Sequence, residues 1–106
     1  MSAVSERDVE RHFVGLGDAH GGWVVKLASP GNAGMPDRMV LFPNGDVSFV
    51  EIKAPGKKPR PLQERIFDRL GCFGHDVAVI DSLEAAEIFW GAMESHDLMA
   101  SSAQGG

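Results

Sequence analysis

The chain has 106 residues, of which 43% are hydrophobic and 24% charged, a composition ordinary for one globular domain with a modest core. No apolar run approaches membrane-spanning length and the N-terminus lacks the apolar segment of a signal peptide, so we expect a cytoplasmic protein without membrane contact. The net charge of −5 argues against a general nucleic-acid coat protein, and the single cysteine excludes an internal disulfide framework.

The first predicted element is a helix that begins at Ser5 and runs to about Gly17. Ser5 is typical of a helix N-cap, and Asp8 occupies the position of its capping-box partner. Apolar residues recur at helical spacing along this segment, which predicts one buried face formed by Val9, Phe13 and Leu16, with His12 as a further member.

Three strands are predicted next, over residues 23–27, 38–42 and 47–53. A loop rich in glycine and proline, at residues 29–36, separates the first two strands. Between the second and third strands, Asn44-Gly45 indicates a hairpin, because both residues suit the left-handed backbone of a tight turn.

A basic loop with several prolines, at residues 54–61, leads into a second amphipathic helix over residues 62–73. Its apolar face is formed by Leu62, Ile66, Phe67 and Leu70. Residues 76–80 predict a fourth strand, apolar enough to lie inside the sheet. Asp81 or Ser82 then caps a last helix that runs to about Met93.

The element order α-β-β-β-α-β-α predicts an α/β fold with one mixed sheet, in which the hairpin is antiparallel and the fourth strand returns through a helical crossover. We expect one domain over residues 1–95 and a disordered tail over residues 96–106. We expect Cys72 to be a small buried hydrophobic residue, and Trp23 and Trp90 to lie in the core or a dimer interface.

The residues that carry chemistry are Asp37, within Gly34-Met35-Pro36-Asp37-Arg38, and the pair Glu51 and Lys53 on the third strand. Carboxylate oxygens are hard ligands that suit Mg²⁺ or Mn²⁺. Because side chains on a strand alternate between faces, Lys53 shares a face with Glu51 and brings an ammonium to the metal pocket. This arrangement is typical of metal-dependent cleavage of phosphodiester bonds.

Each of these residues also has a purely structural interpretation. Asp37 follows a proline, where aspartate often forms a turn, and Lys53 can serve as a salt-bridge partner of Glu51. A carboxylate on a central strand, however, costs several kcal/mol to bury without partners. Function therefore explains Glu51 more easily than packing does.

Of the ten basic residues, six lie between Lys53 and Arg69, so an acidic protein still offers a polyanion one basic stripe. We expect Lys57, Lys58 and Arg60, in the loop after the third strand, to contact phosphates. Lys26 and Arg38, on the first two strands, are further candidates. Arg65 and Arg69 are expected on the solvated face of the second helix.

Other ligands find no support in the sequence. The four histidines show no metal-ligand spacing, and with one cysteine they cannot form a structural zinc site. No glycine-rich phosphate loop ends in Lys-Ser or Lys-Thr, so no nucleotide cofactor is expected. With no second domain to cover its sheet edge the chain has reason to dimerise, and the last helix, with Phe89, Trp90 and Met93, is one predicted interface.

The element order and the Asp…Glu-x-Lys signature resemble the restriction-endonuclease-like PD-(D/E)XK superfamily. More narrowly, three segments resemble the virus-type replication-repair nuclease (VRR-Nuc) family: GMPDR at 34–38, FVEIKAPGKKP at 49–59 and RPLQ at 60–63. The resemblance spans roughly residues 5 to 90. Stand-alone members of that family are small phage or bacterial proteins, which implies a bacterial or phage-infected cell.

The resemblance implies a metal-dependent, structure-specific DNA endonuclease that cuts branched DNA such as four-way junctions as a homodimer. By matched position it implies that Asp37, Glu51 and the carbonyl of Ile52 are metal ligands. It also implies that Lys53 is the catalytic lysine and that the amide of Gln63 supports the site. The first-helix glutamate of the family, which reaches the metal through water, is matched best by Glu10. Glu6, one turn earlier, is the competing choice.

Two other functions remain open from the sequence. One is a DNA-binding or interaction module that keeps the fold without catalysis, although such a module usually loses one of the site residues. The other is a nuclease that acts on RNA or single strands. The sequence predicts no aromatic-rich sheet face of the kind that stacks unpaired bases.

Overall fold

The computed structural model describes residues 3–28, 31 and 33–92 of the chain. The helices and strands follow in the order α1 (Glu6–Ala19), β1 (Trp23–Lys26), β2 (Arg38–Leu41), β3 (Val47–Ile52), α2 (Pro61–Cys72) and β4 (Val77–Ile80). A last helix is present over residues 83–92, so the predicted α/β class and element order are confirmed. The predicted tail at 96–106 lies outside the described residues. No helix in the described ranges is long and apolar enough to cross a membrane.

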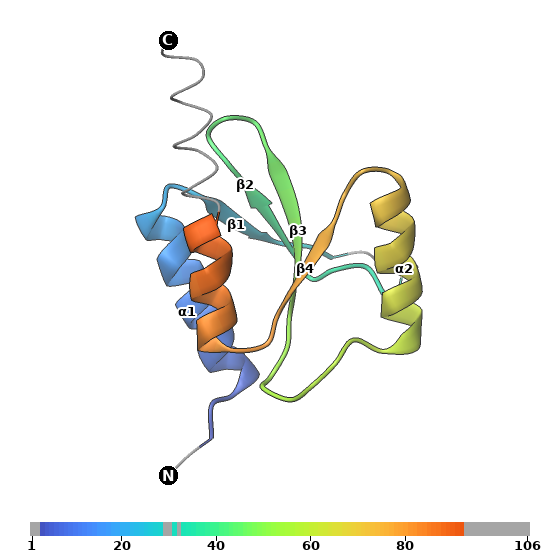
Figure 1. Ribbon diagram of the computed structural model, residues 1–106, viewed down its shortest axis with the longest axis horizontal. Coiled ribbons are helices and arrows are strands. Elements are labelled where there is room, and N and C mark those ends of the chain that lie inside the picture. The colour runs from blue at the N-terminus through green and yellow to red at the C-terminus, as the bar shows by residue number, and fades with distance from the viewer. Residues whose placement is uncertain (1–2, 29–30, 32, 93–106) are drawn as a thin grey trace.

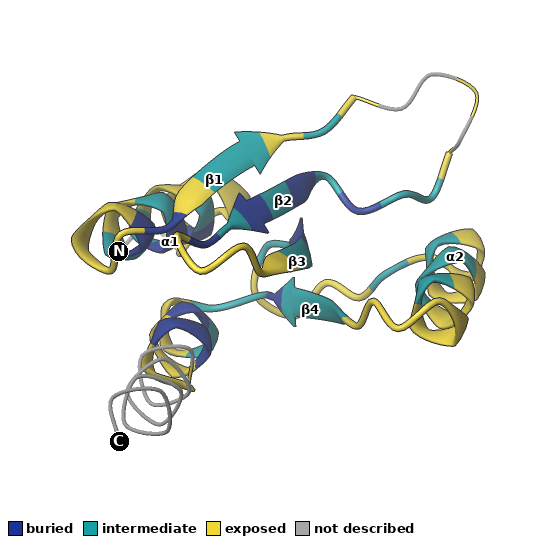
Figure 2. Cartoon of the chain, turned by 90° about the horizontal axis from the view of Figure 1, so that it is seen from above, coloured by how far each residue is buried: buried dark blue, intermediate teal, exposed yellow. Residues whose placement is uncertain are grey.

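The sheet has the strand order β1-β2-β3-β4. The pairs β1–β2 and β2–β3 are antiparallel, and β4 returns through α2 to lie parallel to β3. The prediction that the fourth strand is internal is therefore wrong, because β4 forms an edge. Its apolar sequence has another cause: α1 and the last helix lie on one side of the sheet and α2 on the other, so both faces of β4 are covered (Figures 1 and 2).

Trp90 of the last helix lies at the centre of the main core, between α1 and the sheet. Its side chain is 1% exposed, and its indole N–H donates a 3.0 Å hydrogen bond to the carbonyl of Phe13. The rings of Phe13, Phe42 and Phe89 contact it at centroid distances of 5.1 to 5.8 Å. The aromatic residues of the last helix therefore face the core. The predicted dimer interface through Phe89 and Trp90 is wrong, and Met93 lies outside the described residues.

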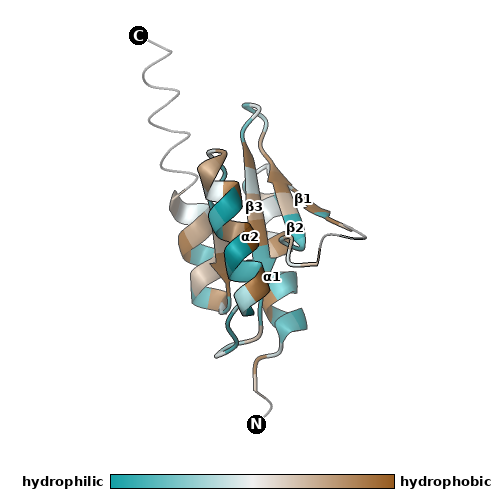
Figure 3. Ribbon diagram, turned by 90° about the vertical axis from the view of Figure 1, so that its right-hand side faces the viewer, coloured by the Kyte–Doolittle hydropathy of each residue, from teal (hydrophilic) through white to brown (hydrophobic). Residues whose placement is uncertain are grey.

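The opposite face of the sheet is covered only in part. Helix α2 has no fully buried residue and lies against β4 rather than β1 (Figure 2). Viewed from the α2 side, the helix presents both hydrophilic and hydrophobic residues (Figure 3). Val24 packs toward the core, so its neighbour Trp23 points to the open face and is 67% exposed. Cys72 is also exposed, at the end of α2, and its predicted burial is wrong.

Local signals set most element ends. The Ser5 side chain accepts from the Asp8 N–H and the Asp8 carboxylate accepts from the Ser5 N–H, which confirms the capping box. Ser82, not Asp81, provides the side-chain cap of the last helix. At the hairpin only Gly45 is left-handed, with φ 94°, so the predicted left-handed conformation of Asn44 is wrong. Asn44 accepts from the Asp46 N–H instead.

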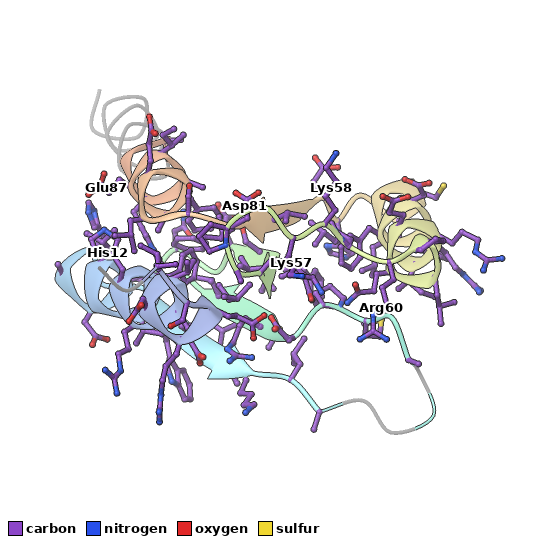
Figure 4. The ribbon with its side chains drawn as sticks, turned by 90° about the horizontal axis from the view of Figure 1, so that it is seen from below. His12, Lys57, Lys58, Arg60, Asp81 and Glu87 are labelled. Carbon is purple, nitrogen blue, oxygen red and sulfur yellow. The ribbon has the colours of Figure 1, made fainter. Side chains whose placement is uncertain are left out.

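His12 does not belong to the apolar face of α1. Its Nε2 lies 3.2 Å from Glu87 Oε1, so the pair links α1 to the last helix at a half-exposed position (Figure 4).

The packing of Trp90 makes a stability prediction about two glycines of α1. A Cβ on Gly17 would lie 2.8 Å from Trp90 Cζ2, whereas a Cβ on Gly15 meets nothing within 4 Å. Gly17→Ala should destabilise the protein by about 1–3 kcal/mol through overpacking. Gly15→Ala should stabilise it by about 0.5–1 kcal/mol through helix propensity. Urea unfolding of the two variants measures both effects, and equal changes would contradict the packing.

Candidate active site

Asp37 and Glu51 meet where β2 begins and β3 ends. The register pairs Arg38 with Val50, which places Asp37 beside Glu51. The Asp37 N–H donates to Glu51 Oε1 at 3.1 Å, and the Ile52 N–H donates to Asp37 Oδ1 at 3.2 Å. The two carboxylates are therefore held together by the backbone of the strands that carry them.

Lys53 and Gln63 complete this group from the α2 side. Lys53 Nζ lies 3.0 Å from Glu51 Oε2, and Gln63 Nε2 donates to the same oxygen at 3.0 Å. Gln63 Oε1 accepts from Lys53 Nζ at 3.1 Å and from the Arg60 N–H, at the start of α2. Glu51 is only 4% exposed, so these partners replace the water that a buried carboxylate loses.

Arg38 joins the site to α1. Its guanidinium donates to the Asp37 carbonyl at 2.9 Å and to Glu10 Oε1 at 2.5 Å. The same group lies 3.6 Å from Asp37 Oδ2, and Arg38 is 7% exposed. Sequence reasoning missed this contact between Arg38 and Glu10. The only signal for it was a charged residue at the first position of a central strand.

The sequence and the fold of this chain match known proteins. The model of the VRR-NUC domain matches residues 19–84. The chain belongs to the VRR-NUC family. It is 46% identical over 88 residues to "Putative nuclease p44" of Acyrthosiphon pisum secondary endosymbiont phage 1, which covers 83% of this chain and 95% of that protein. A solved structure described as a VRR_NUC domain superposes with a TM-score of 0.73 and 35% identity, covering 80% of this chain and 92% of the other.

Asp37 of this VRR-NUC domain has an unusual protonation equilibrium. Burial, and then the neighbouring charge of Glu51, raise the pKa of Asp37 from 3.8 to about 6. The Ile52 N–H and Arg38 oppose this increase in the pKa, whereas the charge of Glu6 adds to it. Glu6 thus acts on Asp37 through its field, while Glu10 is bound by Arg38.

The pair of carboxylates suits a hard divalent cation. Two carboxylates that repel each other in a partly buried site lose that repulsion when a cation binds between them. Across the described residues, no three His, Cys, Asp or Glu side chains gather closely enough to hold a metal ion. A cation held by this pair would need carbonyl or water oxygens as its further ligands within the described part of the chain, and the carbonyl of Ile52 follows Glu51 directly along β3.

The predicted DNA contacts fall into two groups. Lys57, Lys58 and Arg60 are exposed on the loop between β3 and α2, where Lys58 and Arg60 extend to opposite sides (Figure 4). Lys26 is exposed at the end of β1. Arg38 differs from all of these, because its guanidinium faces protein oxygens rather than solvent.

The raised pKa of Asp37 makes stability depend on pH. Because the folded pKa of about 6 exceeds the unfolded value of 3.8, the metal-free protein loses stability as the pH rises through 6. Asp37→Asn, which keeps an oxygen for the Ile52 N–H, should therefore stabilise the protein at pH 8 by about 1 kcal/mol, after allowance for solvent screening. At pH 4 the difference should disappear.

Urea unfolding in EDTA at the two pH values tests this prediction. Asp68→Asn on exposed α2 is the matched control. A stabilisation by Asp37→Asn that is equal at pH 4 and pH 8 would contradict the prediction.

Proposed function

We propose that this VRR-NUC protein is a metal-dependent DNA endonuclease whose active site is the cluster of Asp37, Glu51, Lys53 and Gln63. The observation that carries the proposal is Glu51, a carboxylate buried on a central strand and bound by a lysine, an amide and a backbone N–H. The 46% identical phage relative, named a putative nuclease, supports the same class of activity.

In this proposal Asp37, Glu51 and the carbonyl of Ile52 would hold Mg²⁺ or Mn²⁺. When bound there, such a cation would lower the pKa of a water and offset charge on the attacked phosphate. Asp37 and Glu51 would hold that cation beside the scissile phosphate. Of the two first-helix glutamates, Glu10 or Glu6 supplies the outer acid that the family resemblance implies.

Lys53 orients the attacking water or balances charge that develops on the phosphate. Its Nζ is held between Glu51 Oε2 and Gln63 Oε1, and its side chain is 14% exposed. These contacts fix the ammonium before substrate arrives, which lowers the reorganisation needed during reaction. Gln63 binds both Glu51 and Lys53 and therefore fixes the position of one side chain relative to the other.

DNA is the proposed substrate, and branched DNA such as a four-way junction is the proposed form. Lys57, Lys58, Arg60 and Lys26 would bind its phosphates, which carry no sequence information. A homodimer would place two equivalent sites on the two symmetric strands of a junction. A dimer contact at Trp23, which is 67% exposed on the edge strand β1, would bury that apolar side chain.

The alternative, an inactive module on the same fold, is less well supported. All four residues of the cluster are present: the side chains of Glu51, Lys53 and Gln63 bond to one another, and the Asp37 backbone N–H donates to Glu51. A fold retained only for shape has no need to bury Glu51 beside Asp37, because an apolar residue at that position would cost less free energy to bury.

The catalytic proposal predicts the effects of three substitutions. Asp37→Asn and Glu51→Gln should each lower cleavage of junction DNA by about 100-fold or more, because each removes a charge that holds the cation. Lys53→Ala should lower turnover by a similar factor while metal binding persists, since lysine is not a ligand. Cleavage is measured with Mg²⁺, Mn²⁺ or EDTA, and Glu64→Gln on α2 is the control. Full activity in EDTA would refute metal dependence.

The basic loop predicts how DNA binding depends on salt. Replacing Lys57 and Lys58 with Gln should lower the slope of log affinity against log salt by about 0.9 per lost contact. Arg65→Gln with Arg69→Gln, which removes the same charge from exposed α2, should leave the slope unchanged. Binding of a junction by the Glu51→Gln protein, with mass from light scattering, provides the measurement. Equal slope changes in both double variants would remove the loop from the interface.

A further inference from the structure

Arg38 is a buried charge that the proposed chemistry does not use. Its side chain is 8% exposed, and a guanidinium at such a position is costly unless it is paired and hydrogen-bonded. The partners are Glu10 on α1 and Asp37 at the start of β2. Two elements far apart in the sequence are therefore joined through one side chain beside the active site.

The two partners bind different nitrogens of the guanidinium. Nη2 donates to Glu10 Oε1, while Nη1 donates to the Asp37 carbonyl at 2.9 Å and lies 3.6 Å from Asp37 Oδ2. The planar guanidinium fixes the angle between these nitrogens, so Glu10 determines where Nη1 points. A lysine, with one nitrogen on a flexible stem, cannot replace both contacts.

Asp37 depends on this support. It follows the loop at residues 33–36, and its carboxylate is fixed on one side by the Ile52 N–H. The opposite oxygen, Oδ2, faces Arg38. Arg38 therefore restricts the positions of both the backbone and the carboxylate of Asp37, which is proposed to bind the cation.

We propose that Arg38 and Glu10 are positioning residues for metal binding: Glu10 holds Arg38, and Arg38 orients Asp37. The inference rests on the proposed metal function of Asp37. In this account Glu10 acts on the metal site through Arg38, not through a water in the metal shell, and Arg38 does not contact phosphate. Glu6 remains the first-helix carboxylate with a direct field on Asp37.

The test is a double-mutant cycle on metal affinity, measured by calorimetric titration of Mn²⁺ into the full chain. Arg38→Lys keeps the charge but loses the fork, and Glu10→Ala removes the partner. Each should weaken Mn²⁺ binding by about 10-fold, the size typical of residues that orient a metal ligand. Thermal melts in EDTA establish that each variant is folded.

The double variant decides between the two roles of Glu10. If Glu10 acts through Arg38, the double variant should bind Mn²⁺ with an affinity within about twofold of that of Arg38→Lys alone. The small remaining difference comes from the lost charge of Glu10, whose effect on the cation is screened by solvent. If Glu10 acts independently through water, the two losses multiply to about 100-fold, which would overturn the proposal. Wild-type affinity in Arg38→Lys would also overturn it.

Glu6→Ala is the matched control, because Glu6 is one turn from Glu10 and, within the described residues, it is Glu10 rather than Glu6 that bonds to Arg38. Its effect should multiply with that of Arg38→Lys. If Arg38→Lys fails to fold, Glu10→Asp, which shortens the side chain and keeps its charge, should weaken Mn²⁺ binding instead. A wild-type protein that binds Mn²⁺ but does not cleave DNA would refute the proposed function and leave this cycle decisive.

Discussion

The buried carboxylate of Glu51 is the constraint on which the rest of the site depends. At 4% exposure it requires partners from three directions, which come from Asp37 before β2, Lys53 after β3 and Gln63 on α2. These partners in turn set the position of Asp37, the direction of Lys53 and the start of α2 at Arg60. The contacts that satisfy Glu51 therefore also fix the positions of the sheet and of α2 relative to each other.

The two faces of the sheet serve different purposes. The face under α1 and the last helix holds the packed core around Trp90, which gives the sheet a rigid support. The opposite face carries Glu51 and Lys53 and is only partly covered by α2. Its incomplete cover leaves Trp23 exposed, and this open face is the side of the sheet that carries the proposed active site.

Much of this arrangement could be predicted from the sequence because it depends on local patterns. The Asp37, Glu51 and Lys53 group follows from strand alternation and the hairpin, and Gln63 followed from resemblance. Burial of Cys72, the interior position of β4 and an interface through Trp90 were wrong, because each depends on which elements cover one another. The pairing of Arg38 with Glu10 likewise joins residues 28 apart in the chain, which no local pattern indicates.

The central claim is that Asp37 and Glu51 are held together for a divalent cation. The most direct measurement is thermal unfolding of the wild-type and Glu51→Gln proteins at pH 7.5 as Mn²⁺ is added, without DNA. The account predicts that Mn²⁺ stabilises the wild type, by about 2.7 kcal/mol at one hundred times its dissociation constant, and leaves Glu51→Gln nearly unchanged. Equal stabilisation of both proteins, or none in the wild type, would contradict it.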